Sequence, residues 1–181
     1  KKTTFLFLLL LITKICFSKN ISKKLISEYE DTLALISYKI LNSDNEADRY
    51  SANKGFINIL KEILKYKKSF DYPFDSLTTI SRLYSPDRSF RIFNWLVKKE
   101  TEEYEYFCII QRFNKNRKEY ELTSLKDYSK NIRRAEEKEL DEETWYGAYY
   151  YKIIHEKKKG RQYYILLGKD FNNQYSSKKI I

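Results

Sequence analysis

Two tyrosine-rich stretches near the end of the chain constrain the fold most: WYGAYYYKII at Trp145–Ile154 and QYYILL at Gln162–Leu167. Alternate side chains of an extended strand point to opposite faces, and here both faces carry large apolar groups. The polar segment Glu156–Arg161 between them contains a glycine and predicts a turn, so we expect an antiparallel hairpin. Because strands that are apolar on both faces are typical of covered sheets, we expect this hairpin at the centre of the sheet.

The first eighteen residues predict a secretory signal peptide. Two lysines supply the charged start, Phe5–Ile12 the apolar run and Cys16–Ser18 a cleavage site. The apolar run is about half of the roughly 20 residues that a membrane span needs. We therefore expect an exported protein, periplasmic or extracellular, whose membrane contact is limited to an uncleaved signal or to lipidation at Cys16.

The charge of the chain is strongly basic. It carries 35 Lys and Arg against 25 Asp and Glu, a net charge of +10, and cleavage of the signal with its three lysines lowers this to +7. Such a charge favours anionic envelope polymers or lipid head groups as partners, and export argues against nucleic acid. Cys108 is the single cysteine after residue 18, so the exported chain is expected to lack an intramolecular disulfide.

The N-terminal third predicts a helical hairpin. Apolar residues recur every three or four positions over Asn20–Asn42, with Ser22 or Asn20 as the N-cap. Ser43–Asn45 interrupts the pattern, and a second helix is expected to run to about Lys68 with a weak point at Gly55. An amphipathic pair of this kind covers one face of a sheet.

The hydrophobic period then changes to that of strands. Phe90–Val97, Tyr104–Phe113 and Glu119–Leu125 alternate between two faces and are joined by short polar connections, which predicts a meander. A short helix is expected earlier, at Leu77–Leu83. The predicted fold class is α+β, with an N-terminal helical hairpin packed on an antiparallel β-sheet meander of about five strands.

These elements divide the chain into a signal peptide at 1–18, a helical hairpin at 19–74 and a sheet region of the same domain at 75–181. The charged stretch Asp127–Glu143 has sparse apolar residues, so we expect an exposed helix or a mobile connection there. Gly168–Asn173 has the composition of a loop.

Three segments carry a resemblance: SPDRSFRIFNW, WYGAYYYKII and YYILLGKDFNNQYSSKKII. Together they resemble a family of uncharacterised exported proteins from Bacteroidetes-type bacteria over nearly the whole exported chain. The resemblance implies export and a C-terminal continuation that this chain lacks, so that it is a fragment. Lys169 and Phe171 depart from the family, which has an aromatic residue before Asp170 and a glycine after it. The resemblance implies no activity.

Catalytic and metal-binding groups are scarce in the sequence. His155 is the one histidine and has no partner in sequence for general-base catalysis, and Cys108 lies in an apolar strand where a core role is expected. One histidine and one exported cysteine are too few for a structural zinc site. The oxygen-bearing residues Asp170–Asn173 lack the acidic density of a calcium loop. We therefore predict no catalytic residue, no metal and no cofactor.

A ligand-binding surface is the better candidate. An indole beside amide and charged groups stacks on a sugar ring while its neighbours hydrogen-bond the hydroxyls. The residues that we expect to form this surface are Asp87, Arg91, Asn94, Trp95, Trp145 and Tyr146.

The function that the sequence favours is a non-catalytic, envelope-associated binding or structural domain with a glycan or protein partner. One alternative is a fragment of a hydrolase that uses carboxylates such as Asp87 or Glu105 and lacks its C-terminal part. The other is a nucleic-acid binder that uses the basic, tyrosine-containing region Arg112–Arg134.

Overall fold

The computed structural model describes residues 21–173 and 176–180, and the predicted signal peptide lies outside them. The described chain opens with α1 (Lys23–Asn42) and α2 (Glu46–Leu64), followed by the short α3 (Lys67–Phe70). These helices confirm the predicted hairpin, and α2 runs unbroken past Gly55. None of the described helices is long and apolar enough to cross a membrane.

Side chains at the helix starts fix the hairpin. Ser22 Oγ accepts the Leu25 N–H at 3.1 Å, and Asn45 Oδ1 accepts the Asp48 N–H at 2.8 Å. Each bond satisfies one of the backbone donors that the first turn of a helix leaves free. The predicted N-cap at Ser22 is confirmed.

The meander is also confirmed. β1 (Ser81–Tyr84), β2 (Phe90–Lys98), β3 (Tyr104–Asn114) and β4 (Glu119–Lys126) form one antiparallel sheet in the order β1-β2-β3-β4. The helix predicted at 77–83 is wrong, because residues 81–84 pair with β2 from Ser81 opposite Asn94 to Tyr84 opposite Arg91. Pairing with an adjacent strand outweighs the weak helical preference of so short a segment.

A second sheet packs on the first. β5 (Tyr149–Lys158), β6 (Arg161–Asn173) and β7 (Ser176–Ile180) lie in the order β5-β6-β7. The predicted β5–β6 hairpin is confirmed, but its turn is only Lys159 and Gly160, with φ of 50° and 78°. A two-residue turn with two positive φ angles matches the twist of the flanking strands.

A β-bulge lies between Tyr150 and Lys152 in β5. Tyr150 and Ile153 both pack into the same buried cluster although they are three residues apart. The bulge supplies the extra residue that keeps both side chains on the covered face.

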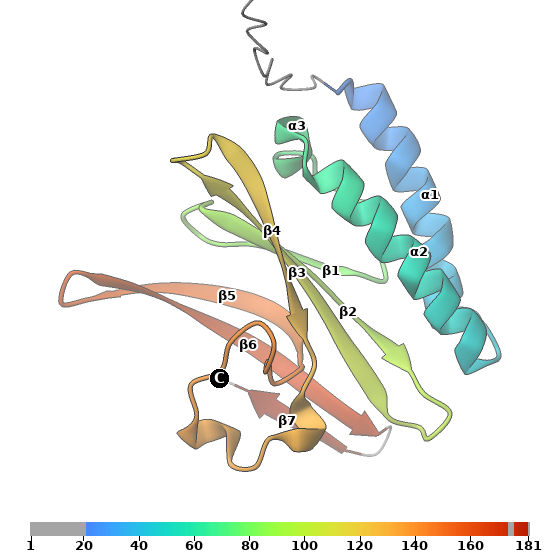
Figure 1. The fold of residues 1–181 in the computed structure, drawn as a ribbon, viewed down its shortest axis with the longest axis vertical. Helices are drawn as coiled ribbons and strands as arrows, with labels where there is room; N and C mark the ends of the chain where they lie inside the picture. Colours follow the sequence, from blue (N-terminus) through green and yellow to red (C-terminus); the bar gives the residue numbers. More distant parts are fainter. Residues whose placement is uncertain (1–20, 174–175, 181) are drawn as a thin grey trace, which may run out of the picture.

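Strands β2 and β3 are covered on both faces. Phe93, Trp95 and Val97 of β2 pack against the helices, while Ile92 packs against the second sheet with Cys108 of β3. Figure 1 shows the helices and the second sheet on opposite sides of β2 and β3. A fully buried side chain of this size contributes about 1.5–3 kcal/mol to folding.

The central, fully covered position predicted for the tyrosine-rich hairpin is therefore wrong. β5 is an edge strand of the second sheet, and Tyr151 and Tyr163 are 43% and 46% exposed. Tyrosine has an apolar ring and a polar hydroxyl, so an apolar pattern that tyrosine dominates does not require burial on both faces.

Two further expectations differ from the structure. The loop predicted at 168–173 is the end of β6, which continues because it pairs with β7. The charged stretch after β4 contains two short 3-10 turns, Ser129–Asn131 and Ala135–Glu137, and no α-helix. Its backbone is held in part by a parallel bridge between Asp127 and Trp145.

Candidate functional site

The six residues of the predicted ligand surface do not come together. Arg91, Asn94 and Trp95 are 2%, 0% and 1% exposed, and they point to both faces of β2. Arg91 and Trp95 face the helices, whereas Asn94 faces the second sheet, because neighbouring strand residues alternate. A surface built on these side chains is therefore wrong.

The polar groups of Trp95 and Asn94 form hydrogen bonds that hold the fold together. Trp95 Nε1 donates to Asn53 Oδ1 at 2.7 Å, and the indole stacks on Phe107. Asn94 joins the two sheets: its Nδ2 donates to the Ala148 carbonyl at 3.0 Å, and its Oδ1 accepts the Tyr150 N–H at 2.6 Å. Each buried polar group is thus satisfied by protein.

The other predicted residues are separated from these. Asp87 is exposed in the β1–β2 turn and accepts the Tyr164 hydroxyl at 2.7 Å. Desolvation raises its pKa, but hydrogen bonds from Tyr164, Ser85 and Ser89 outweigh this, and the net shift is downward. Trp145 is buried, with Nε1 donating to the Tyr150 hydroxyl at 2.8 Å.

Tyr146 lies in a different place, at a polar groove of about 530 Å³. The groove runs between the start of β3 and the segment that follows β4. Its lining comes from Lys99, residues 103–106, residues 127–132 and Tyr146.

Asp127 fixes one wall of this groove. Its Oδ2 accepts the Tyr106 N–H at 2.9 Å, and its Oδ1 accepts both the N–H and the hydroxyl of Ser129, at 3.0 and 2.5 Å. Ser129 Oγ in turn accepts the Gly147 N–H at 2.8 Å. A Cβ at Gly147 would lie 2.6 Å from Asp127 Cγ, so this close approach requires glycine.

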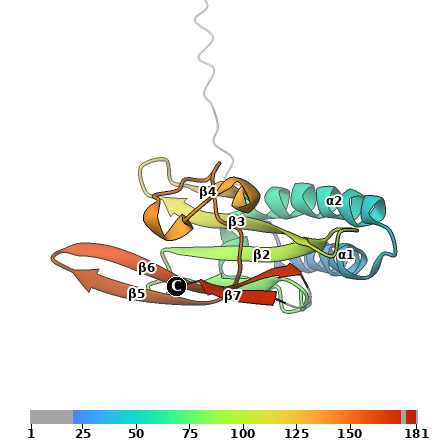
Figure 2. The same cartoon turned by 90° about the horizontal axis from the view of Figure 1, so that it is seen from below.

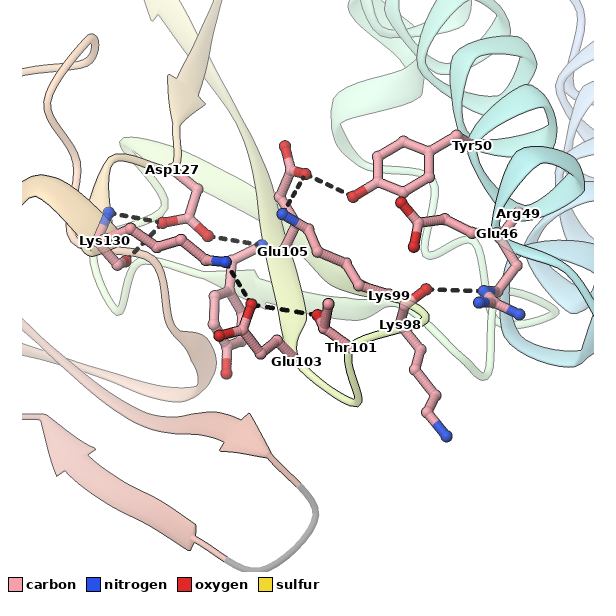
Figure 3. Close-up of polar contacts among 12 residues, drawn as sticks. Glu46, Arg49, Tyr50, Lys98, Lys99, Thr101, Glu103, Glu105, Asp127 and Lys130 are labelled. Atoms are coloured by element: carbon pink, nitrogen blue, oxygen red, sulfur yellow. Dashed lines mark hydrogen bonds and ion pairs between the residues drawn. The ribbon is translucent and has the colours of Figure 1, made fainter.

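Two glutamates of the groove are paired with lysines, as Figure 3 shows. Glu103 is in short contact with Lys130, and Glu105 lies 3.3 Å from Lys99 Nζ. Glu105 Oε2 also accepts the Tyr50 hydroxyl at 2.5 Å. The two lysines thus offset both glutamates, and the carboxylate of Asp127 is held by backbone and hydroxyl donors.

The contact with Lys130 favours the ionised form of Glu103. The hydrogen bond from Lys130 lowers the pKa of Glu103. A general acid needs the opposite shift, towards neutral pH. Burial and then the contact with Glu105 raise the pKa of Tyr50, so this phenol stays protonated and donates.

Tyrosine rings lie beside the charged pairs. Tyr128 is 40% exposed, and Tyr104 is half-buried with its ring edge-on to Phe171. The groove can therefore offer a ring face together with carboxylate acceptors and ammonium donors.

Asp170 lies behind the groove and is fully buried. Its Oδ1 accepts the Tyr106 hydroxyl at 3.0 Å, and its Oδ2 accepts the Tyr146 hydroxyl at 3.2 Å. Among the described residues, no three His, Cys, Asp or Glu side chains are placed to hold a metal ion.

His155 and Cys108 have structural surroundings. His155 stacks on Tyr164 with ring centroids 4.8 Å apart, and its buried Nε2 has no hydrogen-bond partner in the part of the chain described. Cys108 is buried in the core as predicted, and burial raises the pKa of its thiol.

No protein-family model, curated protein or solved structure matches this chain. The resemblance to exported Bacteroidetes-type proteins therefore stays a prediction.

Of the groove residues, Glu105 and Tyr146 were candidates from the sequence, whereas Glu103, Asp127 and Lys130 were not. Lys130 and Glu103 are 27 residues apart, and their contact depends on how the segment after β4 folds back. The sequence signal for a turn at this wall of the groove was the pair Asp127 and Ser129. An aspartate that accepts a hydrogen bond from the backbone N–H two positions later is typical of a turn.

Proposed function

We propose that the protein is an exported, non-catalytic binding domain and that its polar groove holds a hydroxyl-rich glycan of the cell envelope. The single observation that carries the proposal is the pairing of Glu103 with Lys130 and of Glu105 with Lys99 beside exposed tyrosine. A groove of mixed and largely offset charge suits an uncharged ligand with many hydroxyl groups.

Each group has a distinct role in this proposal. The Tyr128 ring stacks on the apolar face of a sugar, and the Glu103–Lys130 pair exchanges hydrogen bonds with its hydroxyls. Asp127 holds the segment that carries both Tyr128 and Lys130, so it orders the groove without contacting the ligand.

A carboxylate-dependent hydrolase is the second candidate, because Glu103, Glu105 and Asp127 line one groove. Hydrolysis of a glycosidic bond needs one carboxyl group protonated near neutral pH. The downward shift of the Glu103 pKa runs against that role.

Nucleic-acid binding through 112–134 receives less support. Arg112 and Arg117 both lie within 3.4 Å of Glu121, and Lys130 is paired with Glu103. Cations that are already offset in this way contribute less to phosphate binding.

Binding of the full chain to an array of envelope glycans, followed by calorimetry with the best ligand, tests the proposal. Tyr128→Ala is expected to weaken binding about tenfold, and Tyr128→Phe to retain most of it, because stacking is worth roughly 1 kcal/mol or more. The matched control is Tyr38→Ala, since Tyr38 is 64% exposed on α1, away from the groove.

Two results would overturn the glycan proposal. One is the absence of binding to any glycan or envelope extract. The other is equal binding by the Tyr128→Ala and Tyr38→Ala variants. Turnover of a glycan that Glu105→Gln abolishes would instead establish the hydrolase.

A further inference from the structure

The outer face of the β5–β6 hairpin is apolar and partly exposed. Ile153, Leu166 and Tyr164 point inward, because they pack in the cluster between the sheets. Their strand neighbours Ile154 and Ile165, which lie opposite each other, therefore point outward.

Two more apolar side chains share this outer face. Tyr163 and Leu167 each lie two positions from Ile165 along β6 and therefore share its face, and Tyr163 is 46% exposed. None of these outward residues belongs to either buried cluster. Figure 2 shows no described helix or strand below the part of the hairpin towards its tip, whereas β7 lies beside the other end of β6.

The tip of the same hairpin is strongly basic. Between residues 149 and 167 the only carboxylate is Glu156, against the five cations Lys152, Lys157, Lys158, Lys159 and Arg161. None of these cations forms an ion pair among the described residues, which is unlike the paired lysines of the groove.

Two of the cations oppose each other directly. Lys158 faces Arg161 across the last pair of the hairpin, on the outer face. Like charges in opposite positions destabilise a strand pair, and an external anion between them would relieve the repulsion.

We propose that this outer face binds an anionic phospholipid surface, with the basic tip on the head groups and Tyr163, Ile154 and Ile165 at the boundary with the acyl chains. Basic clusters are attracted to anionic leaflets, and tyrosine is favoured at the interface because its ring is apolar and its hydroxyl is polar. A soluble polyanion would offset the cations but leave the apolar side chains in water. This contact is independent of the glycan groove. The net charge of the sequence favoured lipid head groups as partners but did not place such a contact on this hairpin.

A reporter on the hairpin tests the proposal in the full chain. Tyr163→Trp places an indole on the outer face, and the native Trp95 and Trp145 are buried and supply a constant background. The variant is mixed with vesicles of phosphatidylcholine alone or with phosphatidylglycerol added, each with or without brominated acyl chains. We expect a blue shift and bromine quenching with the anionic vesicles only, and reversal of both by 0.5 M salt (about a 4 Å Debye length).

Paired charge reversals localise the contact. Lys158→Glu with Arg161→Glu is expected to weaken vesicle binding of the Tyr163→Trp protein at least about tenfold, since each cation adds to the attraction. Lys115→Glu with Lys118→Glu changes the charge equally in the β3–β4 turn and is expected to leave binding within about twofold.

A second reporter, Tyr38→Trp on α1, controls for general adsorption and for contact through the N-terminal segment, and it is expected to show no quenching. Three results would overturn the proposal: no spectral change of Tyr163→Trp with anionic vesicles, equal quenching of both reporters, or the full spectral change with soluble polyphosphate and no bromine quenching. The last result would assign the tip to a soluble polyanion.

Discussion

Arg91 and Gln111 face each other across β2 and β3, and Arg91 Nε donates to Gln111 Oε1 at 2.6 Å. Both side chains are buried. The Arg91 guanidinium also donates to the Tyr72 carbonyl at 2.8 Å and to the Ser69 carbonyl, and Gln111 Nε2 donates to the Leu64 carbonyl at 2.6 Å. The pair thus binds the sheet to the Leu64 carbonyl at the end of α2 and to carbonyls in and just after α3.

Arg91→Lys is expected to lower the free energy of unfolding by about 3 kcal/mol, because an ammonium group cannot reach several acceptors that a planar guanidinium bonds at once. Urea unfolding followed by circular dichroism measures the change. Arg88→Lys is the control, since Arg88 is half exposed in the neighbouring turn, and a shift below about 0.5 kcal/mol is expected there. Equal stability of the two variants would contradict the structural role of Arg91.

Gly147→Ala is expected to destabilise the protein and to disorder the groove wall. The new Cβ would lie 2.6 Å from Asp127 Cγ, in the place where that carboxylate bonds Tyr106 and Ser129. A loss of about 1–3 kcal/mol is expected, because the half-buried hydrogen bonds of the aspartate are broken.

The control variant for Gly147→Ala is Gly55→Ala. A Cβ at Gly55 meets nothing within 4 Å, and the residue lies inside α2. Alanine is favoured over glycine in a helix by about 1 kcal/mol, so the melting temperature of this variant is expected to rise. A fall for both variants in thermal unfolding would contradict the assigned geometry.

The Glu103–Lys130 pair predicts a pH dependence. In the folded protein the pKa of the Glu103 carboxyl is lowered from the ordinary value of 4.5. The folded state therefore binds fewer protons than the unfolded state at acidic pH. The pair therefore stabilises the fold above that ordinary pKa, and the stabilisation is lost as the pH falls through the lower, folded value. Because Glu103 is 38% exposed, solvent keeps the effect below about 1 kcal/mol.

Lys130→Met tests this dependence. Between pH 7 and pH 3 its free energy of unfolding is expected to fall less steeply than that of the unaltered protein, and 0.5 M salt is expected to reduce the difference. Lys115→Met, in an exposed turn, serves as the control. Parallel curves for all three proteins would show that the pair contributes nothing to stability.

The Cys108 thiol is expected to be unreactive in the folded protein, since burial raises its pKa and excludes reagents. In a Cys16→Ser background, titration with Ellman's reagent at pH 8 is expected to be slow until denaturant unfolds the chain. Tyr38→Cys adds an exposed thiol as a positive control. Rapid reaction of Cys108 without denaturant would place it outside the core.

The sequence predicted elements whose side chains repeat with a regular period. Leu33 and Ile40 mark the buried stripe of α1, and the alternation of Ile92 with Phe93 marks the two covered faces of β2. Such patterns can be predicted because the spacing of apolar residues within a short stretch indicates both the type of element and its buried face.

Features that depend on contacts between distant segments could not be predicted. Trp145 was assigned to a strand but lies before β5, where its backbone bridges to Asp127. The groove likewise depends on the bond from Tyr106 to Asp127, and neither residue is unusual in sequence. The predicted Trp95 surface was wrong because an indole in a central strand is buried by the helices.

The bulge at Tyr151 gives β5 one position where its length can change. Deleting Tyr151 would place Tyr150 two positions before Ile153 in a regular strand. Residues two positions apart share a strand face, so both would stay on the covered side. Deleting Ile154 instead would exchange the inner and outer rows of the strand. In descendants of this gene, single-codon losses within β5 are therefore expected to accumulate at Tyr151 and to be purged elsewhere.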